Sequence, residues 1–60
     1  MTEEFVVFDA GGNEVDWIDP YEGHYEYKPG VLHVSNCVYE YLVRVPEGGR
    51  YEIREMEKNE

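Results

Sequence analysis

The stretch VLHVSNCVYEYLVRV, residues 31–45, is the longest run of strand-forming residues in this chain of 60. β-Branched and aromatic residues favour an extended, pleated backbone, and Ser35 and Asn36 interrupt the run with turn-forming side chains. The stretch therefore predicts two strands, residues 31–35 and 38–45, joined by a tight connection.

Side chains of the second of these strands alternate between two faces, as in any strand. Four of them share one face, namely Tyr39, Tyr41, Val43 and Val45. We expect that face to lie on the core. Leu42 is then left on the more polar face, together with Val38.

Four further segments predict strands, at residues 4–9, 14–18, 24–28 and 51–56. The first, EFVVFD, is apolar on both faces, so little of it should be exposed. Turn-forming residues separate the strands, at residues 10–13, 19–23, 29–30 and 46–50. Pro29 and Gly30 fit the two central positions of a type II turn.

The first of these turns has the sequence DAGGN, residues 9–13, in which two glycines and an asparagine tolerate a positive φ. It resembles the Asp-x-x-Gly-Asn hairpin of tyrosine-aspartate repeat proteins, over this single turn. The resemblance implies a hairpin between the first two strands.

Together these patterns predict an all-β fold, an antiparallel meander of five or six short strands that forms a small barrel or a strongly twisted sheet. One alternative is a five-stranded, SH3-like barrel in which residues 24–28 are loop. Another is an open sheet that a second copy of the chain covers. In the meander the last two strands pair, which would place Glu52 and Arg54 opposite Arg44 and near Glu40 as cross-strand ion pairs.

The length fits one small domain, residues 1–60, with residues 57–60 as an acidic tail that we expect to fray. A domain of this size buries only about 60% of its unfolded surface, so its stability should be marginal. Cys37 is the only cysteine, and with His24 and His33 it shows no spacing typical of a metal site. We predict no metal and no cofactor, and self-association as the most plausible support.

Five basic residues stand against fourteen acidic ones, a net charge of −9. This charge opposes direct binding to nucleic acid or an anionic membrane and favours basic partners. The sequence shows no secretory leader pattern and no apolar run near the roughly 20 residues that span a bilayer. We therefore expect a cytoplasmic protein.

Most of the negative charge lies in residues 1–30, which carry eight acidic residues and one basic residue. Carboxylates at strand spacing on a rigid sheet can imitate a row of phosphates and contact a basic groove. The candidates for such a contact are Asp16, Asp19, Glu22 and Glu26. The alternative is a solvated face that keeps the protein soluble and discourages edge-to-edge pairing.

Trp17, Tyr21 and Leu42 are candidate aromatic or apolar contacts, because Trp and Tyr often anchor interfaces. For Trp17 we expect burial instead, as the largest side chain of a small core.

No residue pattern predicts catalysis. His24 and His33 could exchange protons with Glu26 or Glu40, but surface or cross-strand histidines are the simpler interpretation. Cys37 has no basic neighbour in the sequence to activate it, and we expect a buried, inert thiol. A chain of this length has little room for both a core and a water-excluding pocket, so we do not expect an enzyme.

In size, acidity and aromatic content the chain is similar to the short DNA-mimicking inhibitors made by bacteriophages, such as those that block uracil-DNA glycosylase. The resemblance is one of composition. With the acidic surface it favours a small protein-binding module or inhibitor that engages a basic surface of a larger protein, such as a nucleic-acid-binding one. The resemblance implies that such an inhibitor is phage-encoded. The alternative is a homo-oligomeric structural or accessory protein without an inhibitory role, in which the chain forms a homodimer.

Overall fold

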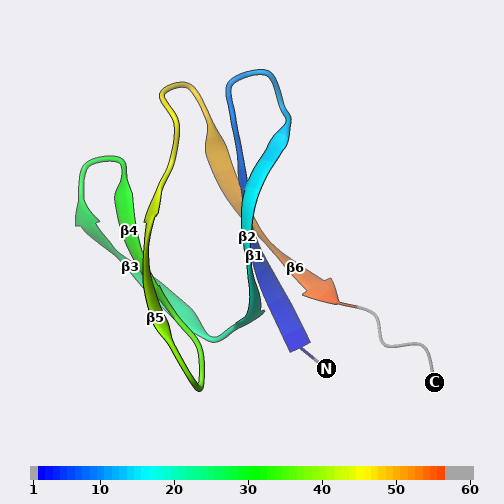
Figure 1. The fold of residues 1–60 in the computed structure, drawn as a ribbon. Coiled ribbons are helices and arrows are strands. Elements are labelled where there is room, and N and C mark those ends of the chain that lie inside the picture. The colour runs from blue at the N-terminus through cyan, green and yellow to red at the C-terminus, as the bar shows by residue number, and fades with distance from the viewer. Residues whose placement is uncertain (1, 57–60) are drawn as a thin grey trace.

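The computed structural model describes residues 2–56, which form two antiparallel three-stranded sheets and contain no helix (Figure 1). The strands are β1 (Thr2–Phe8), β2 (Glu14–Tyr21), β3 (Gly23–Lys28), β4 (Val31–Ser35), β5 (Glu40–Arg44) and β6 (Arg50–Met56). The predicted all-β class is confirmed. The tail at residues 57–60, which we expected to fray, lies outside the described residues.

The first sheet has the strand order β2-β1-β6, so β1 is its central strand. β1 pairs with β2 on one side and with β6 on the other, and Phe5 lies between Ile18 and Ile53. The expected pairing of β6 with β5 is therefore wrong. β1 is apolar on both faces, and the central position of a sheet buries such a strand best; Phe5, Val6 and Val7 are fully buried there.

The ion pairs expected between β5 and β6 do not form, because the two strands do not pair. Arg54 lies beside β1 instead, and its Nη2 donates to carboxylate oxygens of Glu4 and Glu14, each at 2.9 Å. Glu52 accepts from Arg50 on its own strand at 3.0 Å. Neither residue lies opposite Arg44, because β5 belongs to the other sheet.

The second sheet has the order β3-β4-β5. β4 spans Val31–Ser35, as predicted, whereas β5 is shorter than the expected residues 38–45. In the connection between them Asn36 Oδ1 accepts from the backbone N–H of Val38 at 2.8 Å and of Tyr39 at 2.7 Å. Gly30 has a φ of 79°, which fits the third position of a type II turn.

The chain passes from one sheet to the other with a single residue, Glu22, between β2 and β3. The break expected at residues 19–23 is wrong, since β2 continues through Asp19, Pro20 and Tyr21, with the Asp19–Pro20 peptide cis. Proline is tolerated there because β2 is an edge strand. Residues 24–28 form a strand, not the loop of the SH3-like alternative.

The two sheets pack on each other through their inner faces. The first sheet contributes Phe5, Val7 and Ile18 to the core, and the second contributes Leu32, Val34 and Val43. Tyr21 and Val45 pack against this cluster.

Of the four side chains at residues 39–45 that were expected in the core, only some are buried. Val43 is buried and Val45 half-buried, but Tyr39 is 61% exposed because it belongs to the connection before the strand. Tyr41 lies at the margin of the core and is 38% exposed. Leu42 and Val38 are exposed, as predicted.

Trp17 is 61% exposed, so its expected place in the core is wrong. Alternation along β2 turns Ile18 inward beside Phe5 and turns Trp17 outward, opposite Val6. Val6 is fully buried on that outer face. Cys37 is exposed in the connection between β4 and β5, which corrects the expectation of a buried thiol. Residues 2–56 contain no helix long and apolar enough to cross a membrane.

Candidate protein-binding cleft

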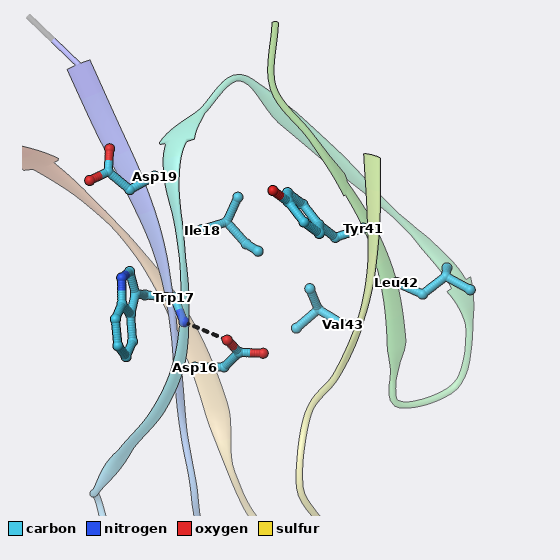
Figure 2. A pocket seen from close by; sticks show the side chains of 7 residues that line it. All are labelled: Asp16, Trp17, Ile18, Asp19, Tyr41, Leu42 and Val43. Carbon is cyan, nitrogen blue, oxygen red and sulfur yellow. Dashed lines mark hydrogen bonds between the residues drawn. The ribbon is translucent and has the colours of Figure 1, made fainter. Parts of the chain in front are cut away.

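A cleft of about 350 Å³ lies between β2 and β5. Each of these strands is an edge strand of its own sheet, so two unpaired strand edges border the cleft. Its lining consists of Asp16, Trp17, Ile18, Asp19, Tyr41, Leu42 and Val43 (Figure 2).

The floor of the cleft is apolar. Ile18 is 8% exposed and Val43 is 2% exposed, and both belong to the core. In Figure 2, Ile18 from β2 and Tyr41 and Val43 from β5 point toward one another across the cleft. The ring of Tyr41 thus forms one side of the cleft, next to the buried aliphatic side chains of Ile18 and Val43.

The rim carries negative charge and further apolar groups. Asp16 extends from β2 toward Val43, whereas Trp17 and Asp19 lie on the opposite side of β2, and Leu42 points away from the cleft on the far side of β5 (Figure 2). The four side chains are exposed. A ligand in the cleft would therefore meet the carboxylate of Asp16, whereas the carboxylate of Asp19 lies on the other side of β2.

Asp16 also protects the edge of β2. Its Oδ1 accepts a hydrogen bond of 2.9 Å from the backbone N–H of Trp17 (Figure 2). An unpaired strand edge is a template for pairing with another chain, and a local side chain that occupies an edge donor weakens that pairing. A partner strand would have to displace this contact or to dock beside it.

The structure brings together four of the seven predicted contact residues, Asp16, Asp19, Trp17 and Leu42. Glu22 is exposed at the junction of β2 and β3. Glu26 lines a separate pocket of about 380 Å³, which Arg50 and Tyr51 also line. The acidic row expected from Asp16 to Glu26 is thus divided between different places.

Three residues of the cleft were not predicted as contacts, namely Ile18, Tyr41 and Val43. The alternation of β5 marked Tyr41 and Val43 as core residues. It could not show that β2 would stand opposite them, because the two strands belong to different sheets and do not pair.

Tyr21 belongs to an aromatic cluster on the inner side of the molecule. Its hydroxyl lies 2.6 Å from Nδ1 of His24, and Nε2 of His24 lies 3.3 Å from the hydroxyl of Tyr51. Phe5 stacks on both tyrosine rings, with centroid distances of 5.6 and 4.9 Å. Burial, then the charges of Glu3 and Tyr51, raise the pKa of Tyr21.

The histidines occupy different environments. His24 contacts the two tyrosines, not Glu26, whereas His33 Nε2 lies 3.4 Å from Glu40 Oε1 on the outer face of the second sheet. Tyr25 stacks on His33 with a centroid distance of 4.8 Å. His33 is therefore a cross-strand histidine, the simpler interpretation of the sequence.

Within residues 2–56, no three His, Cys, Asp or Glu side chains lie close enough together to hold a metal ion. Searches of protein-family profiles, curated protein sequences and solved structures with this chain gave no significant match.

Proposed function

We propose that this protein is a small binding module or inhibitor that engages a basic surface of a larger protein through the cleft between β2 and β5. One observation carries the proposal: the two strands that border the cleft, β2 and β5, carry the sequence candidates Asp16, Trp17, Asp19 and Leu42, and Asp16 extends over the apolar floor. A few charged groups around an apolar depression are typical of specific binding sites.

The charge of the chain favours a basic partner. The net charge of −9 raises the local concentration of cationic surfaces and repels nucleic acid and anionic lipid. A Lys or Arg side chain of the partner would extend along Ile18 and Val43 with its alkyl stem and place its charged end at Asp16. The basic grooves of nucleic-acid-binding proteins offer such side chains in rows.

Aromatic residues of both bordering strands supply contact area, Tyr41 inside the cleft and Trp17 on the opposite side of β2. Trp17 and Tyr41 are 61% and 38% exposed, and exposed Trp and Tyr side chains are the most frequent anchors of protein interfaces. The proposed role is binding, for which the negative charge of Asp16 and the apolar floor of the cleft are sufficient.

The test compares two variants of equal net charge as baits on a lysate of the native host. D16N/D19N removes the two carboxylates of the cleft, and E47Q/E55Q removes two exposed carboxylates elsewhere. We expect D16N/D19N to lose a protein that the wild type and E47Q/E55Q retain. The affinity for that protein, once purified, should fall about tenfold or more with D16N/D19N and weaken as salt increases.

Equal retention by the two variants would overturn the cleft as the binding site. Binding that is unchanged at high salt would overturn the electrostatic part of the proposal. Backbone amide shifts in NMR spectra of the labelled module should change along β2 and β5 when the purified partner is added.

A further inference from the structure

The outer face of the second sheet carries three cross-strand rows of side chains. The rows are Lys28–Val31–Arg44, Tyr25–His33–Leu42 and Gly23–Ser35–Glu40. Cations therefore lie at one end of this face, an acid lies at the other end, and aromatic and aliphatic groups lie between them.

The middle row is exposed and mainly apolar at both ends, with the partly buried His33 between Tyr25 and Leu42. Tyr25 is 57% exposed and Leu42 is 61% exposed, and the ring of Tyr25 stacks on His33 at an interplanar angle of 16°. The first sheet covers only the inner face of β3, β4 and β5, and the outer face has no covering element among residues 2–56 (Figure 1).

The two cations of this face differ from the other described basic side chains. Arg50 pairs with Glu52, and Arg54 pairs with Glu4 and Glu14. Among residues 2–56, no ion pair within 4 Å involves Lys28 or Arg44. In a chain with fourteen acidic residues, these two charges remain available to another molecule.

We propose that this face binds a second copy of the chain. A two-fold axis along the middle row would place the row of Lys28 and Arg44 over the Glu40 row of the partner, twice per dimer. Leu42 would meet its own counterpart at the axis. A two-fold axis parallel to the strands would oppose cations to cations, so the charge pattern selects one orientation. Such self-complementarity is what an isologous dimer requires.

The area of this face limits the expected affinity of the dimer. A standard interface buries about 800 Å² per partner, and the whole accessible surface of this protein is 4442 Å². Three short strands offer less than the standard area, so we expect a reversible dimer with a dissociation constant of roughly 10 to 500 µM. The part of the chain that the structure describes has a small core of eight buried apolar side chains, which would gain stability from the added contact.

Sedimentation equilibrium from about 10 µM to about 1 mM protein at physiological salt tests the dimer. Two charge reversals test its orientation, R44E and E40R, because each opposes like charges at both symmetry-related contacts. We expect each to weaken self-association about tenfold. An equimolar mixture of R44E and E40R should recover association, since both contacts in the mixed dimer are again between opposite charges and its total charge equals that of the wild-type dimer.

Matched controls separate this face from general effects of charge and polarity. E47R changes the net charge as E40R does but lies outside the three rows, and it should associate at least as well as the wild type. L42S should weaken association, while V15S, an exposed valine of β2, should not.

A monomeric wild type at about 1 mM would overturn the proposal. The proposal would also be overturned if the mixture of R44E and E40R associated no better than the separate variants. Equal association of the wild type and L42S would overturn it as well.

Discussion

The hydroxyl of Tyr21 lies 2.6 Å from Nδ1 of His24, and this contact ties the end of β2 to the beginning of β3 at the point where the chain changes sheets. Tyr51 completes the cluster from β6. His24 of the second sheet is therefore linked by polar contacts to Tyr21 and Tyr51 of the first sheet. Both tyrosine rings stack on Phe5.

Tyr21→Phe should lower the free energy of unfolding by about 1 kcal/mol at neutral pH, because it removes one partly buried hydrogen bond. Tyr27→Phe is the control, because that side chain is 58% exposed and should change stability little. Denaturant unfolding of the two variants measures the difference. Equal stability of both would contradict a structural role for the contact.

Burial, then the charges of Glu3 and Tyr51, raise the pKa of Tyr21, which gives the contribution of its phenol to stability a pH dependence. The phenol ionises more readily in the unfolded chain than in the folded one, so its contribution is complete below the ordinary tyrosine pKa of about 10 and is lost as pH rises through the folded value. Between about pH 9 and pH 11 the wild type should lose stability more steeply than Tyr21→Phe.

Asp9 organises the hairpin between β1 and β2. Its Oδ1 accepts from the backbone N–H groups of Gly11 and Asn13, each at 2.9 Å. The hydrogen bond from the backbone of Asn13 is the main reason that the pKa of Asp9 is lowered. The turn expected from the sequence DAGGN is confirmed, with Gly12 at a φ of 84°.

Asp9→Asn should lower the melting temperature at neutral pH, since it weakens these charge-assisted hydrogen bonds. Because the pKa of Asp9 is lower in the folded chain, its carboxylate stabilises the fold fully above the unfolded aspartate pKa of about 3.9. This stabilisation is lost as pH falls through the pKa of the folded state. The difference from wild type should thus shrink toward about pH 2. Asp19→Asn, at an exposed aspartate of β2, should leave the melting temperature at neutral pH unchanged. For Asp9→Asn, a difference that persists undiminished at low pH would refute the role of the charge.

Val34 belongs to β4 and is fully buried in the core, whereas Val38 is 66% exposed. Val34→Ala should lower the free energy of unfolding by about 2 kcal/mol, through lost burial and the cavity that remains. The same substitution at Val38 should cost less than about 0.5 kcal/mol. Guanidinium unfolding curves should separate the two variants by midpoint and not by slope.

Gly49 is required by a close approach of two backbones. A Cβ added there would overlap the carbonyl oxygen of Phe8 and lie 3.0 Å from that of Pro46. Gly49→Ala should therefore destabilise by about 1–3 kcal/mol, since backbone atoms cannot move aside as a side chain can. Gly23→Ala is the matched control, because its Cβ would meet nothing within 4 Å; thermal melts in which both variants lose the same stability would refute the argument.

The sequence predicted the individual strands better than their partners. β4 was predicted to the residue because turn-forming residues bound its strand-forming run, Gly30 before it and Asn36 after it. The pairing of β1 with β6 was missed because local hairpin rules connect only neighbouring strands. Both faces of residues 4–9 are apolar, and this was the one signal for a central strand.

The candidate site was recovered in part for the same reason. Asp16, Trp17 and Asp19 are close in sequence on β2, so their shared location follows from one strand. Leu42 joins them only through the packing of two sheets. Trp17 was expected in the core on grounds of size, but its position beside Ile18 decides its face, since only one of two successive residues can point inward.

The central position of β1 also governs the order in which this fold can be completed. Phe5 pairs with Ile53, 48 residues later in the chain, while its pairing with β2 needs only the neighbouring hairpin. During synthesis β1 must therefore present one unpaired edge, with fully apolar side chains beside it, until β6 emerges. Contacts of such long sequence separation slow folding, and the nascent chain is open to wrong strand partners throughout that interval.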